Sequence, residues 1–207
     1  MRSDFVEQAI FEKIFPYMTP ENVRAVSLSL QTGLRIGDVV SLKRRQLNKK
    51  TRVLSFIAQK TGKNGTCELS LAMVDMLCKN SGKIYLFEGK DTNHHRTRQA
   101  VWADVKKACK RAGVDGVNVT PHSARKNYAV NLYRRSGSIS EVQASLQHNN
   151  AELSRYYATS DIKKAPFELS NEAVVFIQEI VSNSLRLCLA DFFCKNCPLQ
   201  QQERNNV

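Results

Sequence analysis

The sequence predicts a mostly helical fold with one small antiparallel β-sheet, an α+β arrangement, and three observations support this expectation. Apolar residues recur at helical spacing, most clearly over residues 97–112. Proline at a first helical position and glycine after a last one mark several helix boundaries. The main strand-like segment, residues 53–71, contains Asn64-Gly65, a dipeptide typical of tight hairpin turns.

Capping residues set the expected boundaries of the helices. Thr19 and Pro20 open a helix that ends at Gly33, and a second short helix begins near Arg35. The later helices are expected over residues 97–112, 120–137 and 140–148.

Two local signals refine this expectation. The turn in the strand-like segment places Lys60 and Lys63 near the tip of a basic hairpin. Ser140, with a glutamine three residues later, forms a capping box for a short helix that ends near His148.

The charge balance indicates a polyanionic partner. The chain has 31 Lys+Arg against 19 Asp+Glu, a formal net charge of +12, and a pI near 9.6. Charge alone does not separate DNA from RNA or an acidic membrane, and a generally basic, solvated surface is the alternative. We expect no signal peptide, because the first residues lack an unbroken apolar run, and no apolar run approaches membrane-spanning length.

The cysteines indicate a reducing compartment. The chain has six cysteines and no recognisable export signal, so we expect reduced thiols in a cytoplasm rather than a disulfide framework. Cys194 and Cys197 form a CxxC, but only Cys188 lies near them, whereas a structural zinc site usually has four ligands. We expect no metal.

A His-x-x-Arg pair is the first candidate for chemistry. His122 and Arg125 are three residues apart, so they share one face in the first turn of a helix, where free N–H groups favour a phosphate. The alternative is a surface pair with no joint role. The residues around the pair favour a shared site, because His148 and Tyr157 follow at spacings of 23 and nine residues.

Several segments resemble one known family. TGLRIGDVVSLKRRQL is similar to the first conserved box of tyrosine recombinases, the phage integrase family, and TPHSARKNYAV followed by LQHNNAELSRYYATSD is similar to the second. LFEGKDTNHHRTRQAVWADVKKACKRAGV resembles the family's helix between the hairpin and the His-x-x-Arg motif. The resemblance covers about residues 5–162 and implies the fold of the tyrosine recombinase catalytic domain.

The resemblance also implies roles for individual residues. It implies that Arg35 and Arg125 clamp the phosphate and that Lys60 is the lysine of the hairpin. His122 and His148 match the two histidine positions, and Tyr157 matches the nucleophile. Asp38 matches the acidic position of the first box, and we expect it to support Arg35.

The chemistry of a phosphodiester agrees with those roles. Guanidinium groups bind its nonbridging oxygens with bidentate geometry better than lysine does. A phenol has a pKa of about 10, so Tyr157 needs a base, for which His122 is the natural choice. Lys60 would protonate the departing 5′ oxygen, and His148 would donate to a nonbridging oxygen, although it is alternatively a surface histidine that ends a helix.

Tyr156 and Tyr157 are adjacent, and the family spacing from His148 selects Tyr157 as the nucleophile. Attack by tyrosine gives a 3′-phosphotyrosine that a 5′ hydroxyl of another strand reverses. This chemistry requires neither ATP nor metal, so we expect no cofactor.

The resemblance implies a site-specific DNA recombinase or integrase that cleaves and rejoins double-stranded DNA. Its expected assembly is a homotetramer on two DNA sites, in the cytoplasm of a bacterium or encoded by a phage or mobile element, with no membrane or small-molecule partner. The alternatives are a topoisomerase of type IB-like chemistry and a DNA-binding protein that keeps the fold without recombining.

Other basic residues are expected to contact the DNA backbone. They are Lys43, Arg44, Arg45, Lys63 and Arg96. Some of these side chains are alternatively only solvated.

The remaining expectations concern the ends of the chain and one turn. Residues 1–162 form the catalytic domain, with the family's N-terminal core-binding domain absent; residues 163–193 form an amphipathic helix that packs into its own domain or contacts a neighbouring subunit; residues 194–207 form a polar tail. The family's Leu-Gly-His turn has Gln147 in place of glycine, which predicts modest backbone strain.

Overall fold

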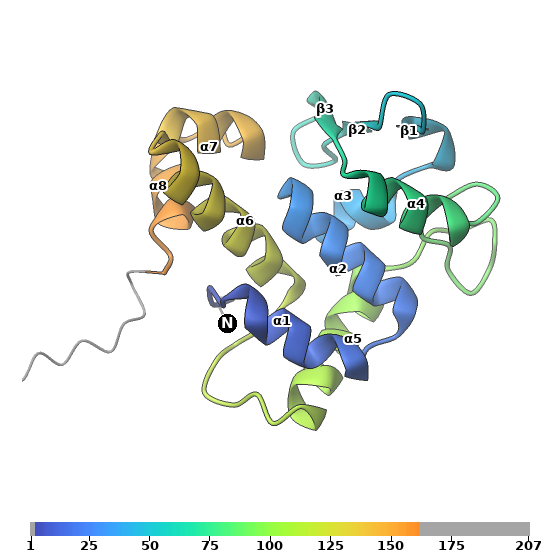
Figure 1. Ribbon diagram of the computed structural model, residues 1–207, viewed down its shortest axis with the longest axis horizontal. Helices are drawn as coiled ribbons and strands as arrows, with labels where there is room; N and C mark the ends of the chain where they lie inside the picture. Colours follow the sequence, from blue (N-terminus) through green and yellow to red (C-terminus); the bar gives the residue numbers. More distant parts are fainter. Residues whose placement is uncertain (1–2, 162–207) are drawn as a thin grey trace, which may run out of the picture. The chain divides into compact units, whose positions relative to one another are not determined.

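The computed structural model describes residues 3–161, and Figure 1 shows their arrangement. The expected helix at 163–193, the polar tail and the CxxC cysteines lie outside the described residues. The helices are α1 Gln8–Ile14, α2 Pro20–Thr32, α3 Ile36–Val40, α4 Leu71–Lys79, α5 Arg98–Arg111, α6 Pro121–Ser136, α7 Ile139–Leu146 and α8 Ala151–Ala158, and the strands are β1 Leu47–Asn48, β2 Val53–Ile57 and β3 Asn64–Glu68. Two 3-10 helices cover Phe15–Tyr17 and Arg44–Gln46. The predicted fold class, mostly helical with a small antiparallel sheet, is confirmed.

The sheet has the order β1-β2-β3, and both strand pairs are antiparallel. The predicted turn at Asn64-Gly65 is wrong, because these residues begin β3, where Asn64 pairs with Ile57. The chain reverses instead between Ala58 and Lys63, whose backbone groups bond at 2.9 Å. Gly62 supplies the left-handed backbone that this turn needs, with φ of +65°. Lys60 therefore lies in the hairpin loop, as expected.

The predicted helix boundaries are correct at most caps. Gly33 and Gly137 end α2 and α6 in the left-handed conformation, with φ of +69° and +65°. The predicted cap of α7 is wrong, because Ser138 rather than Ser140 accepts from the backbone of Glu141. Gly137 ends α6 only one residue earlier, so the next helix begins almost at once.

The hydrophobic core has two parts. The larger part lies among α1 to α5 and the sheet, and includes the fully buried Phe11, Leu28 and Leu54. The smaller part lies among α6, α7 and α8, where Leu146 and Tyr157 are buried together. In Figure 1, α2 and α6 lie side by side between these two groups. The ends of α2 and α7 therefore meet where the two parts of the core join.

Gly33 is required at this junction for two reasons. Its positive φ disfavours other residues, and an added Cβ would lie 2.8 Å from Cδ2 of Leu146 and closer still to the ring of Tyr128.

No described helix is both long enough and apolar enough to span a lipid bilayer.

We predict that Gly33→Ala lowers the free energy of unfolding by roughly 2–4 kcal/mol, because backbone strain and overpacking add. Gly137→Ala is the matched control, since Gly137 has a similar φ of +65° and nothing within 4 Å of an added Cβ. It should cost only about 1 kcal/mol. Urea unfolding of both variants measures this difference, and equal losses would contradict the steric account.

Candidate active site

Tyr157 lies on α8, with its side chain buried against two histidines. Its hydroxyl is hydrogen-bonded to Nε2 of His122. The ring centroids of His122 and His148 lie 5.5 and 5.0 Å from that of Tyr157, both in edge-on geometry. Burial raises the pKa of Tyr157, and the positive charges of Arg125 and Arg35 oppose this rise. The hydroxyl is therefore protonated at neutral pH and needs an acceptor before it can attack.

His122 is the acceptor that the fold provides. It occupies the first turn of α6, where the Thr120 hydroxyl accepts from its backbone N–H at 3.2 Å. Burial, followed by the charges of nearby cations, Arg125 and Lys126 foremost, lowers the pKa of His122 to about 4. The imidazole is neutral near pH 7, so Nε2 has a lone pair available for the Tyr157 proton.

Arg125 is buried and is bound to two backbone carbonyls. Its NH1 donates to the carbonyl of Gly33 at 2.6 Å, and its NH2 donates to the carbonyl of Leu146 at 2.7 Å. Its Nε has no hydrogen-bond partner within residues 3–161. Burial, followed by the charge of Arg35, lowers the pKa of Arg125 to about 10, which still leaves the guanidinium charged at neutral pH. Arg125 thus joins the end of α2 to the end of α7.

Arg35 precedes α3 and forms a loose ion pair with Asp38, with 4.0 Å between NH1 and Oδ2. Asp38 is buried, and its Oδ1 accepts from the backbone N–H of Gln59 at 3.0 Å. Asp38 therefore contacts both Arg35 and the hairpin, whereas the sequence had suggested support for Arg35 alone.

His148 follows α7 and is only 5% exposed, so the alternative of a surface histidine is wrong. Its Nδ1 lies 3.1 Å from the hydroxyl of Ser154. Burial, and then Arg125 and Arg35, lower the pKa of His148 to about 4. The Ser154 hydroxyl fixes the direction of the ring, which leaves Nε2 as the nitrogen available to a ligand.

Lys60 is exposed in the hairpin loop, and its charge contributes to lowering the pKa of both His122 and His148. The six predicted residues therefore lie close enough together in the structure for their charges to affect one another. Their field is positive, because Arg35, Lys60 and Arg125 outnumber the carboxylate of Asp38 among these groups. Such a field favours an anion with several oxygen acceptors, as in a phosphodiester.

Two residues of the site were missed by the sequence analysis. Lys126 is 5% exposed, and its ammonium lies 3.4 Å from the Tyr156 hydroxyl and 6.0 Å from the centroid of the Tyr157 ring. The available signal was the spacing, because a lysine four residues after His122 lies on the same face of the helix. Ser154 had no comparable signal, because its contact with His148 depends on the turn between α7 and α8.

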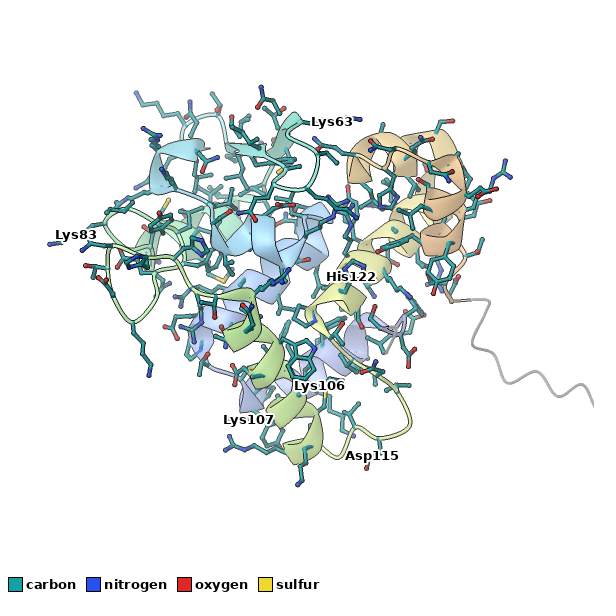
Figure 2. The ribbon with its side chains drawn as sticks, turned by 180° about the vertical axis from the view of Figure 1, so that it is seen from behind. Lys63, Lys83, Lys106, Lys107, Asp115 and His122 are labelled. Carbon is teal, nitrogen blue, oxygen red and sulfur yellow. The ribbon has the colours of Figure 1, made fainter. Side chains whose placement is uncertain are left out.

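A cavity of about 740 Å³ opens beside Tyr157. Trp102, Leu153 and Tyr156 line it together with His122 and Tyr157. Trp102 and Leu153 are 50% and 41% exposed. In the view of Figure 2, His122 lies between the hairpin that carries Lys63 and the helix α5 that carries Lys106. This face combines basic side chains with exposed apolar ones next to Tyr157.

The predicted DNA-contacting residues differ in their surroundings. Arg44 and Arg45 are exposed on the second 3-10 helix, and Lys43 just before it is half-buried. Lys63 is exposed and donates to Oδ1 of Asn149 at 3.1 Å.

Arg96 is already engaged within the fold. Its Nε donates to the side chain of Asn22, and its NH2 donates to the Thr19 hydroxyl at 3.4 Å.

Within residues 3–161, no group of three or more His, Cys, Asp or Glu side chains is arranged to hold a metal ion.

A family model described as the phage integrase family matches residues 9–164, so the chain belongs to that family. The prediction of this family from the sequence is confirmed.

Curated relatives agree with this assignment. Tyrosine recombinase XerA of Pyrococcus horikoshii is 28% identical over 132 residues, which cover 60% of this chain and 45% of the relative. A putative integrase/recombinase, y4qK, of Sinorhizobium fredii is 30% identical over 146 residues, covering 66% and 47%. The chain thus spans about half the length of the curated relatives it matches.

Solved structures show the same fold. The catalytic domain of bacteriophage HP1 integrase superposes with a TM-score of 0.59 at 21% identity, covering 82% of this chain and 98% of that one. A lambda integrase dimer bound to a COC' core site gives 0.64 at 20% identity, covering 78% and 49%.

We predict that the imidazole of His122 titrates with a midpoint near pH 4 in the free protein. Because folding lowers this pKa from 6.5, the unfolded chain binds more protons between about pH 4 and 6.5. The contribution of His122 to stability is therefore present above pH 6.5 and is lost as the pH falls through this window. An NMR titration, assigned with His122→Gln, measures the midpoint, and a value near 6.5 would contradict the buried, neutral base.

Proposed function

We propose that this protein is a site-specific DNA recombinase that cleaves and rejoins strands through a 3′-phosphotyrosine on Tyr157. The observation that carries the proposal is the hydrogen bond between the Tyr157 hydroxyl and the neutral Nε2 of His122, inside a cationic site. Membership of the phage integrase family supports the same chemistry.

The cleavage step balances as a transesterification. Oη of Tyr157 attacks the scissile phosphorus, and its proton passes to Nε2 of His122. The bond from phosphorus to the 5′ oxygen breaks, and Lys60 gives that oxygen its proton. The phosphotyrosine keeps the bond energy, so a 5′ hydroxyl of another strand attacks it and releases Tyr157 without ATP.

The cations act on the charge that develops during attack. Arg35 and the remaining N–H groups of Arg125 bind the nonbridging oxygens, and each such donor contributes about 10²–10³ in rate. In the tautomer in which the Ser154 hydroxyl donates to Nδ1, His148 carries its proton on Nε2 and donates it to the same phosphate. Burial of these groups strengthens the interaction, because little water competes with the phosphate.

Double-stranded DNA is the proposed substrate, and the cytoplasm is the proposed compartment. The gene would lie on a bacterial chromosome, in a phage or in a mobile element. Lys43, Arg44, Arg45 and Lys63 would grip phosphates on either side of the site without reading bases. The DNA role predicted for Arg96 is the weakest of the set, because its side chain already binds Asn22.

The central test is formation of a covalent adduct. We expect a detergent-resistant adduct when the protein is incubated with nicked, labelled duplexes that tile the DNA beside its own gene. Tyr157→Phe should abolish it, and the matched control Tyr156→Phe should retain it.

The other outcomes identify the alternatives. Binding without any adduct would leave a DNA-binding protein that keeps the fold. Adducts with relaxation of supercoils, but without exchange between two sites, would indicate a topoisomerase.

We further propose that four copies assemble on two duplexes, because exchange requires cleavage of four strands. The lambda integrase dimer bound to a core site supports two copies for each duplex. Mass photometry with the duplex that forms the adduct should show four protomers with two duplexes. Exchange products formed while the complex stays at two protomers would contradict this assembly.

A further inference from the structure

The hairpin that carries Lys60 is hydrogen-bonded to the turn that carries His148. Nε2 of Gln147 donates to the backbone carbonyl of Asn64 at 3.3 Å. The ammonium of Lys63 donates to Oδ1 of Asn149 at 3.1 Å. Gln147 and Asn149 flank His148, so both contacts converge on the turn between α7 and α8. In Figure 1 the loop between β2 and β3 faces the end of α7.

Gln147 makes its contact from a backbone conformation that disfavours it. Its φ of 51° and ψ of 42° place it in the left-handed region, where glycine is the favoured residue. The strain expected from the sequence is therefore present in the backbone. A non-glycine residue in this region at an active site points to a role for its side chain.

The side chain of Gln147 is closely fitted to the hairpin. A Cβ added to Gly65 would lie 2.5 Å from Nε2 of Gln147 and 2.5 Å from the ring of Phe56. Oε1 of Gln147 is buried and has no hydrogen-bond partner among residues 3–161, so the contact to Asn64 is what orients the amide. Glycine at position 65, which did not form the predicted turn, lets the two backbones approach.

The hairpin is also held on the other side of its loop. Oδ1 of the buried Asp38 accepts from the backbone N–H of Gln59, the residue before Lys60. The loop is thus anchored at Gln59 and again at Lys63 and Asn64, and Lys60 lies between these anchors. Fixing a catalytic group in this way raises its effective concentration at the reacting atom.

We infer that Gln147 is a positioning residue, which together with Asn149 holds the hairpin so that Lys60 reaches the departing 5′ oxygen. This inference rests on the proposed function, because it assigns Gln147 to the proton-transfer step of that reaction. The same contacts connect the hairpin of Lys60 to the turn of His148, so the positions of these two side chains depend on each other.

The test compares two substrates with the full chain. One is the ordinary duplex that forms the adduct, and the other carries a 5′-bridging phosphorothiolate, whose sulfur leaves as a thiolate without a proton. Lys60→Ala is the reference variant, and we expect it to be slow on the ordinary duplex and restored by the phosphorothiolate.

Gln147→Gly should behave like Lys60→Ala, only more mildly. We expect adduct formation on the ordinary duplex to slow by roughly 10- to 100-fold, since a misplaced catalytic group costs about that much. The phosphorothiolate should restore the rate to near that of the wild type. The urea midpoint should stay the same or rise, because glycine relieves the strained backbone.

Gln147→Asn separates the side chain from the backbone. Asparagine tolerates the left-handed conformation but is one methylene shorter, so we expect the same defect and the same rescue. Asn149→Ala tests the second contact and should give a smaller loss, again restored by the phosphorothiolate.

Failure of this inference is distinct from failure of the proposed function. If the wild type forms no adduct on either substrate, the proposed function is wrong. If the wild type is active and Gln147→Gly equals it, or stays slow on the phosphorothiolate, the positioning role is wrong. A defect in Gln147→Gly with a normal Gln147→Asn would assign the effect to the backbone and would also overturn the inference.

Discussion

The guanidinium of Arg125 is the group on which the geometry of the site depends. By donating to the carbonyls of Gly33 and Leu146, it fixes the end of α2, which leads to Arg35, against the end of α7, which leads to His148. A buried charge with two good acceptors is costly to disturb, because removing its partners leaves it unpaired. One side chain thus joins the two parts of the core, and in the proposed reaction it also binds the phosphate.

The same cluster of charge acts on His122 and Tyr157. Burial and the nearby cations keep His122 unprotonated, so an imidazole in a strongly basic protein remains able to accept a proton. Burial also raises the pKa of Tyr157, although Arg125 and Arg35 lower it, so in the proposed reaction the hydroxyl keeps its proton until His122 accepts it.

The sequence predicted the features that depend on local rules. Proline, threonine and glycine at helix ends located α2 and α6, and the order of the family motifs selected six residues that the structure places close together. The turn was mispredicted because Gly65 serves close packing against Phe56 and Gln147, which no local pattern reveals. Lys126 and Ser154 were missed for a similar reason, since their partners Tyr156 and His148 come from other segments.

The identity of the modified side chain tests the central claim most directly. The adduct would be trapped on a nicked duplex, digested with nuclease and protease, and sequenced by tandem mass spectrometry. The account predicts a nucleotide attached through its 3′ phosphate to Tyr157 in the peptide from α8. Attachment to Tyr156, or to any serine or histidine, would contradict the site described for this protein.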